Sequence, residues 1–496
     1  MFHCFALLFA AIVLSALPAT RTAGSVPINQ ASSIEPGELT LVRPYLIAAD
    51  PARVEITPLL TSGDIVSDYQ MAGVPDGLGA YRAGDDVVLF MNHELTQEEE
   101  TNLSAARVSR LVLDGVTGAV KHGEYVIDGT EGYWALCSAT LAAPEVGFAA
   151  PVFLTGEETV AGPHGGIVLG IDAASGTVTE LPWLGAFRHE NQVVVPGFTG
   201  KTVLLLTDDD ALASELYLYV ADDPQGVLHG RGQLYVFTAD DGATTAAIAK
   251  GISLTGRFVP IDQTVVRDAV ALQRAVEAAG AFRFVRLEDA THDRAMPGAV
   301  YFADNGDDAP PNLATPTGEP LSKNGRLYHM QLDPSDPTLV TSLQVLLDGD
   351  DGDDLRNPDN IDATETTVMI QEDLNWYNRY WNLDGTAGAD AYGNPVLWAD
   401  VEERAPGRVL AYDVESGAVT VVARIDQSDA PDRLVDIGYE GGAWESSGII
   451  DASDFFGPGA WLLDVQAHTA LAPQFGGVDE GGQLLLLRAN DDQRRS

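Results

Sequence analysis

The chain contains very little cysteine, with only Cys4 and Cys137 among its 496 residues. Cys4 lies in an apolar N-terminal stretch typical of a cleaved export signal, so we expect the mature protein to keep Cys137 alone. One cysteine excludes an internal disulfide framework. Outside the cytoplasm a lone thiol is open to oxidation unless it is buried or bound to metal. Cys137 is therefore either a small buried apolar residue or a soft metal ligand.

Basic residues are also scarce: Lys and Arg total 28 against 73 Asp and Glu, which gives a formal net charge of −45. A field of this sign repels nucleic acid and anionic membranes, and both are excluded as expected partners. The same field attracts cations. Most acidic side chains are explained by a solvated surface, whereas acids clustered at strand ends are candidate metal ligands.

Long apolar runs are absent from the sequence. The apolar stretch at residues 5–14 is too short to span a bilayer, and no later segment is long enough. Small residues near Ala19 and Ala23 offer cleavage points, and no twin arginine precedes the stretch. We therefore predict a signal peptide at residues 1–23 and a secreted or periplasmic, monomeric protein. The remainder, residues 24–496, is predicted to form one domain without a membrane span.

The 50 glycines and 27 prolines favour many turns over long helices. One series of short apolar segments ends abruptly in acids or amides, as buried strands do. This series comprises residues 87–94, 152–158, 203–210, 300–305, 368–373 and 461–468. About six such strands predict an all-β, six-bladed β-propeller with loop insertions, whose strand ends place carboxylates around one axial mouth.

Two further segments have their own predicted roles in this propeller. Residues 269–279 have helical composition and are followed by Gly280, which predicts a small inserted helix. Residues 24–45 form a polar lead-in that could supply a strand closing the ring.

Carboxylates that converge in a partly dry channel repel one another strongly unless cations lie between them. Oxygen-rich sites outside the cell favour Ca²⁺. A thiolate from Cys137 would favour iron or another transition metal instead. The residue types therefore suggest a mixed metal site, provided that they meet in space.

Several short motifs resemble, in the same order, those of the PhoX-type alkaline phosphatases. They include Asn92-His93-Glu94, Leu136-Cys137-Ser138, Thr155-Gly156-Glu157-Glu158, Phe187-Arg188-His189-Glu190, Arg286-Leu287-Glu288-Asp289, Pro358-Asp359-Asn360, Glu372-Asp373, Glu445-Ser446-Ser447-Gly448 and Gln466-Ala467-His468. The resemblance implies a six-bladed propeller with an iron–calcium cluster (Fe³⁺ and Ca²⁺) that hydrolyses phosphomonoesters. It implies that Cys137 binds iron and that Arg286 contacts the substrate phosphate. The implied ligands of the iron and calcium ions are Glu94, Glu157 or Glu158, Glu190, Glu288, Asp373 and Glu445.

Alternatives remain open from the sequence. A calcium-dependent lactonase or esterase propeller would need only calcium, and a calcium-binding propeller without enzymatic activity would use the acids for stability. A phosphodiesterase would fit the same site. His93, His189 and His468 are more simply explained as hydrogen-bonding groups than as ligands. Arg286 could pair with Glu288 or Asp289 alone.

Overall fold

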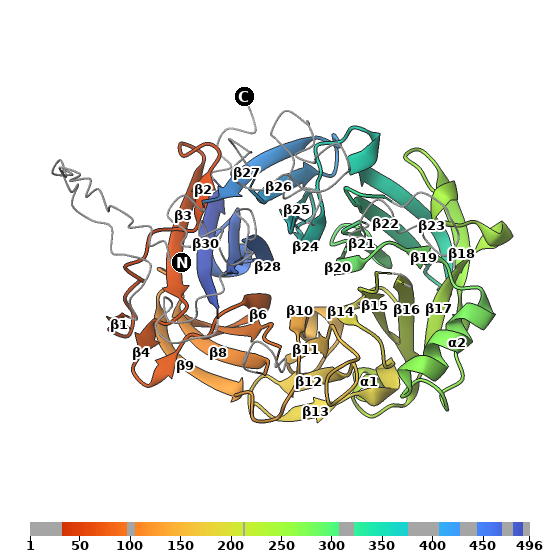
Figure 1. The fold of residues 1–496 in the computed structure, drawn as a ribbon, viewed down its shortest axis with the longest axis horizontal. Helices are drawn as coiled ribbons and strands as arrows, with labels where there is room; N and C mark the ends of the chain where they lie inside the picture. The colour runs from red at the N-terminus through yellow and green to blue at the C-terminus, as the bar shows by residue number, and fades with distance from the viewer. Residues whose placement is uncertain are drawn as a thin grey trace, which may run out of the picture.

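Six four-stranded antiparallel blades surround a central axis (Figure 1). The computed structural model describes residues 32–96, 105–211, 214–306, 322–374, 406–426, 444–468 and 480–489. The predicted signal peptide and Cys4 lie outside these ranges. The blades confirm the all-β, six-bladed propeller that the sequence predicts.

The first three blades follow one another along the chain. Blade 1 contains β6 (Pro75–Ala83), β7 (Asp86–His93), β8 (Arg107–Asp114) and β9 (Val120–Ile127). Blade 2 contains β10 (Leu136–Ala142), β11 (Val152–Glu157), β12 (Val168–Asp172) and β13 (Val178–Glu180). Blade 3 contains β14 (His189–Val194), β15 (Thr202–Asp208), β16 (Ser214–Ala221) and β17 (Gly232–Ala239).

The second half of the ring repeats this order. Blade 4 contains β20 (Leu287–His292), β21 (Ala299–Asp304), β22 (Arg326–Asp333) and β23 (Asp336–Asp348). Blade 5 contains β24 (Pro358–Ala363), β25 (Thr367–Glu372), β26 (Arg408–Asp413) and β27 (Val419–Ile425). Blade 6 contains β28 (Glu445–Asp451), β29 (Ala460–Ala467), β30 (Gly481–Ala489) and β3 (Val54–Thr61).

The remaining elements lie around the six blades. β18 (Ser253–Pro260) joins blades 3 and 4 by pairing with β17 and β23, and β2 (Leu46–Ala48) extends blade 5. The others are β1 (Ser33–Ile34), β4 (Ile65–Val66), β5 (Tyr69–Gln70), β19 (Arg283–Phe284), α1 (Pro224–Leu228), α2 (Ala269–Ala279) and α3 (Ser453–Phe456). No helix in the described part of the chain has the length and apolarity that a membrane crossing requires.

The ring is closed by β3, which pairs with β30 as the outermost strand of blade 6. The sequence prediction placed this role in residues 24–45, which is wrong: within that stretch the described strand β1 pairs with β4 instead. The reason lies in the apolar content of β3, whose Leu59 and Leu60 are fully buried. A polar lead-in offers no comparable buried surface.

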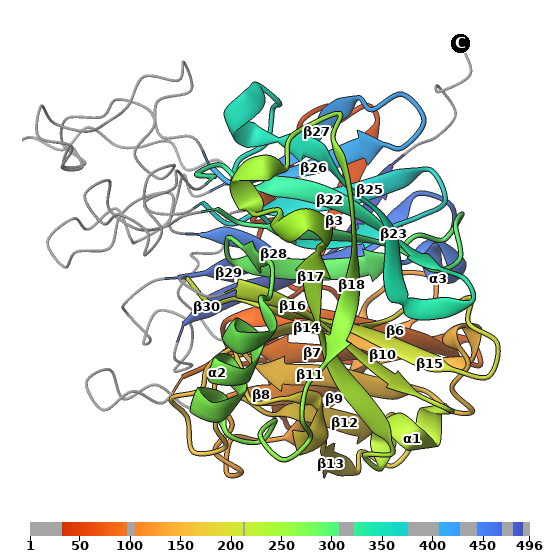
Figure 2. The same cartoon turned by 90° about the vertical axis from the view of Figure 1, so that its right-hand side faces the viewer.

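The inserted helix α2 has the bounds that the sequence predicts. Asp268 caps its start by accepting a hydrogen bond from the Ala271 N–H, and Gly280 ends it in the left-handed conformation at φ 73°. Its buried Leu272 and Val276 pack on the core of blade 3. Figure 2 shows the helix against the outer side of β17.

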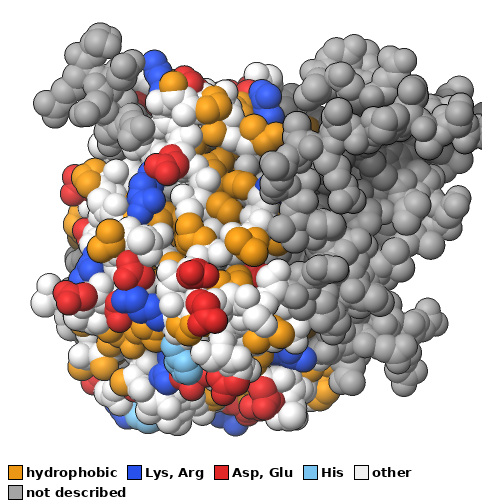
Figure 3. Space-filling view, turned by 90° about the vertical axis from the view of Figure 1, so that its left-hand side faces the viewer, with side chains coloured by type: hydrophobic (Ala, Val, Ile, Leu, Met, Phe, Trp, Pro, Cys, Tyr) orange, Lys and Arg blue, Asp and Glu red, His pale blue; other side chains and the backbone are white. Residues whose placement is uncertain are grey.

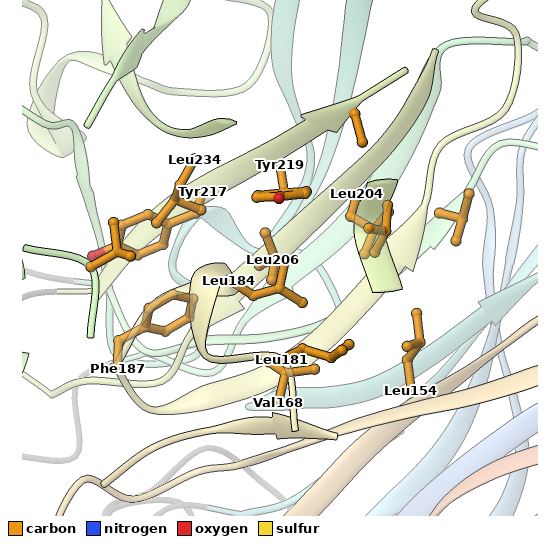
Figure 4. Packing of buried hydrophobic residues seen from close by; sticks show 14 of the residues in the cluster. Leu154, Val168, Leu181, Leu184, Phe187, Leu204, Leu206, Tyr217, Tyr219 and Leu234 are labelled. Atoms are coloured by element: carbon orange, nitrogen blue, oxygen red, sulfur yellow. The ribbon is translucent and has the colours of Figure 1, made fainter. Parts of the chain in front are cut away.

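Apolar clusters between neighbouring blades hold the ring together. Figure 4 shows one of them, in which Leu154 and Val168 of blade 2 pack against Leu204, Leu206 and Tyr217 of blade 3. On the outer face in Figure 3, acidic and basic side chains of the described residues are scattered among apolar ones. The rigid blades therefore fix the innermost strands β6, β10, β14, β20, β24 and β28, each of which contacts the next around the axis.

Candidate metal centre

Every innermost strand carries a β-bulge close to its start, at the end of the axis here called the mouth. The register shifts lie between Pro75 and Leu78, Leu136 and Ala139, His189 and Gln192, Leu287 and Ala290, Pro358 and Ile361, and Ser446 and Ile449. A bulge turns a side chain away from the regular alternation of its strand. The first residue inside each bulge, called the bulge position, is Asp76, Cys137, Glu190, Glu288, Asp359 and Ser447 in blades 1 to 6.

The second strand of each blade supplies another residue at the mouth. In each blade, one residue of the second strand pairs with the residue just before the bulge, and the next residue along the chain is called the strand-end position. In blades 1 to 6 this position holds Glu94, Glu158, Asp209, Asn305, Asp373 and Gln466. In blades 1 to 5 its N–H donates to the carbonyl that precedes the innermost strand. These bonds join Glu94 to Val74, Glu158 to Ala135, Asp209 to Arg188, Asn305 to Arg286 and Asp373 to Asn357, at 2.8–3.1 Å. The same backbone bond therefore fixes the strand-end residue in five blades.

These positions bring acids from all parts of the chain together with one thiol. The ligand atoms form four overlapping groups, within each of which all atoms lie within 4.8 Å of one another. The groups are Asp76, Glu94 and Cys137; Cys137, Glu158 and Glu190; Glu190, Glu288 and Asp359; and Asp359, Asp373 and Glu445. Shared members make the groups one continuous arc, which includes Cys137 and six of the predicted carboxylates.

Some carboxylate oxygens of the arc are buried without the partners that a charge needs. Both oxygens of Glu190 are buried without a hydrogen-bond partner among the described residues, as is Oδ1 of Asp359. Burial, followed by the charges of Glu158 and Asp359, raises the pKa of Glu190 well above its usual range. Burial and the charge of Asp76 raise the pKa of Glu94 to about 7. Such groups stay ionised together only if cations lie among them.

The donor set fits the metals that the family resemblance implies. Carboxylate oxygens suit Ca²⁺, which accepts many oxygen ligands in irregular geometry. The Cys137 thiol lies in two of the four groups and is the one soft donor in the arc, which suits a transition metal such as iron. Burial and the nearby carboxylates raise its pKa, so a bound cation would be needed to hold it as a thiolate.

Asp76 and Asp359 belong to these groups but were missed among the sequence candidates. A signal was present: each follows a proline at the start of an innermost strand, as Pro75-Asp76 and Pro358-Asp359. Asp76 is also tied into the site by Gln466, whose Nε2 donates to Asp76 Oδ2 and Glu94 Oε2 at 3.0 Å each.

Glu157, one of the two candidates in its pair, lies outside the groups. Its Oε1 accepts from the Trp134 N–H at 2.9 Å and its Oε2 from the Gly166 N–H at 3.1 Å. The alternation of side chains along a strand turns Glu157 into its own blade and leaves Glu158 at the mouth. The structure thus assigns the mouth position to Glu158.

Because Glu158 lies at the mouth and Glu157 accepts backbone hydrogen bonds, we predict opposite outcomes for substitutions of these two residues. Glu158→Gln should lower the metal content and the activity while leaving the fold intact. Glu157→Gln should retain the metals but destabilise the fold by about 1–3 kcal/mol, because it disturbs buried backbone partners. Elemental analysis and thermal unfolding of both variants check this. Metal loss in the Glu157 variant alone would reverse the assignment.

Arg286 lies beside the arc in a constrained conformation. Its φ of 55° is left-handed, which costs a non-glycine residue roughly 1–2 kcal/mol. Its Nη1 donates to Asn305 Oδ1 at 3.1 Å, and its Nη2 lies 3.2 Å from Glu288 Oε1. Its remaining partner is Asp209. The pairing with Glu288 considered from the sequence is present, whereas Asp289 instead accepts from the Ile361 N–H.

The three histidines differ in their surroundings. The ring of His93 hydrogen-bonds the Gly73 carbonyl and Ser109, and that of His189 hydrogen-bonds the Gly185 carbonyl. Both are buried and belong to none of the four groups. His468 lies between Glu480, at 2.8 Å from Nδ1, and Glu445, at 3.6 Å from Nε2. It contacts the arc from outside through Glu445.

Comparison with known families identifies the chain. A family model described as alkaline phosphatase PhoX matches residues 154–425, more than half of the sequence. Together with the six-bladed propeller and its acidic mouth, this match defines the protein as a phosphoric ester hydrolase of the alkaline phosphatase type. The chain belongs to the PhoX alkaline phosphatase family.

A solved structure agrees on the fold. The chain is similar to PhoX of Pseudomonas fluorescens in complex with vanadate, a transition state analogue, with 14% identity and a TM-score of 0.62 over 94% of this chain and 98% of that one. It is more distantly similar to a luciferin-regenerating enzyme, with 8% identity and a TM-score of 0.41 over 85% and 92% of the two chains. No curated protein matched the sequence.

Proposed function

We propose that the protein hydrolyses phosphomonoesters at the mouth of the propeller, with iron and calcium ions held by the arc. Cys137 would bind iron. The iron and calcium ions would share Asp76, Glu94, Glu158, Glu190, Glu288, Asp359, Asp373 and Glu445. The observation that carries the proposal is the continuous arc, in which one thiol stands among buried carboxylates and neither oxygen of Glu190 has a hydrogen-bond partner among the described residues.

When bound, the metals would supply Lewis-acid stabilisation of the charge on the phosphoryl group. The chain itself orients the substrate. The planar guanidinium of Arg286 presents a fork of N–H donors that matches two phosphate oxygens. The vanadate complex of the similar Pseudomonas protein supports phosphoryl-transfer chemistry at a propeller of this kind.

The test is turnover of p-nitrophenyl phosphate by the purified, metal-loaded protein, beside bis-p-nitrophenyl phosphate and a panel of lactones. We expect the monoester to be preferred. Arg286→Ala should reduce kcat/KM for it by about 10²–10³-fold, the usual cost of removing a positioned charge-stabilising donor. Lactone turnover that survives replacement of Cys137 would favour a calcium-dependent lactonase. Stabilisation by calcium without any turnover would favour a binding protein.

We also propose export with removal of the N-terminal segment. Expressed from its full sequence, the protein should be recovered outside the cytoplasm as a monomer that begins after a cleavage point near Ala19 or Ala23. Cell fractionation, N-terminal sequencing and size-exclusion chromatography check these points. Recovery of the intact chain from the cytoplasm would contradict export.

A further inference from the structure

Comparison of the six blades separates the mouth into two sectors. In blades 1, 2 and 5 the strand-end residues Glu94, Glu158 and Asp373 belong to the candidate cation groups. In blades 3 and 4 the same position holds Asp209 and Asn305, which belong to none of the groups among the described residues. Both of these side chains instead bond to one guanidinium.

That guanidinium is Arg286, and Asp209 is its principal partner. Nε of Arg286 donates to Asp209 Oδ1 at 3.1 Å and Nη2 donates to Oδ2 at 3.0 Å, which is a bidentate pair. Asp209 is 4% exposed, so the pair is largely shielded from water and its geometry is well defined. Nη1 is held separately by Asn305. Asp209 therefore binds the Nε and Nη2 side of the guanidinium, and Asn305 binds Nη1.

The backbone around this pair is tied across the junction of blades 3 and 4. The Asp209 N–H donates to the Arg188 carbonyl at 3.1 Å. Ser214 Oγ accepts from the Leu287 N–H and donates to the Asp208 carbonyl, both at 2.8 Å. Residues adjacent to each member of the pair are therefore linked through one hydroxyl, which fixes the distance between Arg286 and Asp209.

We infer that Asp209 is a positioning residue for phosphate binding: it holds Arg286 with its fork at the boundary of the arc, so that blades 3 and 4 form the phosphate-docking sector. This inference rests on the proposed function, because it assigns Arg286 to the substrate phosphate. Asp209 acts through Arg286 and does not itself touch the substrate.

The first test is Asp209→Asn in the metal-loaded protein, which keeps the shape of the side chain but replaces one acceptor oxygen with a donor. We expect KM for p-nitrophenyl phosphate and the inhibition constant of inorganic phosphate each to rise about tenfold, since phosphate is bound in the ground state. The metal content should be unchanged. Asp210→Asn is the matched control, because Asp210 pairs with the partly exposed Arg188 at 3.4 Å, and it should leave both constants unchanged.

The second test is a double-mutant cycle with Arg286→Lys, which retains the charge but cannot form the bidentate pair. If Asp209 acts only through the fork of Arg286, adding Asp209→Asn to the lysine variant should change KM by less than about twofold. Equal fold-changes in the wild-type and lysine backgrounds would overturn the inference. Loss of metal from the Asp209 variant would also overturn it, because that residue would then be a ligand.

The two proposals fail in different ways. If the wild-type protein does not hydrolyse phosphate esters, the proposed function is wrong. If the wild type is active and Asp209→Asn behaves like Asp210→Asn, only the positioning role is wrong. Thermal unfolding of each variant ensures that a change in KM is compared among folded proteins.

Discussion

Replacement of Cys137 by serine is expected to remove the transition metal and to lower kcat/KM for a phosphomonoester at least about a hundredfold. Cys137 belongs to two of the four ligand groups, and its Sγ lies 3.2 Å from Asp76 Oδ2. A serine hydroxyl is a hard and weakly acidic donor, so it would not replace a thiolate. The oxygen-only groups should still bind calcium.

The measurement is elemental analysis of the purified variant together with its steady-state kinetics. Ser138→Ala is a suitable control, because Ser138 is the next residue in the same bulge, belongs to none of the ligand groups, and accepts at Oγ from Asn360 Nδ2 at 3.1 Å. This control should keep its iron. A Cys137→Ser protein with unchanged iron and activity would show that the thiol is merely a buried apolar group.

Removal of all metals by a chelator is expected to lower Tm by about 5 °C or more and to abolish activity, because ligands that bind only the folded state stabilise it. The loss should grow as the pH rises. Without cations, Glu94 has a folded pKa of about 7 and Glu445, raised by burial and by Asp373, one of about 8, against an ordinary value of 4.5.

The sign follows from proton binding. Between about pH 4.5 and 8 the folded metal-free protein holds protons that the unfolded chain has released. Raising the pH through this window therefore favours unfolding. Below about pH 4.5 both states are protonated and the penalty disappears. Bound metals reverse the trend, because they compete with protons for the same carboxylates and bind better as the pH rises.

Thermal unfolding of metal-free and metal-loaded protein between pH 4 and 9 checks this, with the difference between the two curves as the readout. Asp289 and Asp304 are a built-in control: burial raises the pKa of each to about 7, and both lie outside the ligand groups. Their effect should be common to both forms and should cancel in the difference. Parallel curves would indicate that the arc does not hold the metals.

The sequence predicted the architecture because buried strands have a strong local signature. Uninterrupted apolar runs such as those before Glu94 and Glu158 reveal both the blade and the end of the strand that faces the mouth. Helix α2 was also predicted correctly, since its cap at Asp268 and its end at Gly280 are local signals. Ring closure was not, because the pairing of β3 with β30 joins segments that are more than 400 residues apart.

The sequence of one acidic pair does not reveal which of its two side chains faces the mouth, because that depends on how the strand is oriented in its blade. Glu157 is turned inward onto the Trp134 and Gly166 N–H groups, and Asp208, its counterpart in blade 3, precedes the mouth residue Asp209 in the same way. Comparison of the blades would have indicated that the second residue of each pair faces the axis. The bulges that turn Asp76 and Asp359 into the arc arise from the register between strands, so the sequence marks these residues only weakly, through the proline that precedes each aspartate.

The pairing of β3 with β30 has a consequence for how the arc assembles. The arc draws side chains from all six blades, with Glu445 from blade 6, and blade 6 has its four strands only when β30 is paired with β3. The complete arc therefore forms only after β3 and β30, which lie more than 400 residues apart, have paired. If the arc holds cations as proposed, binding of the full set depends on this long-range pairing.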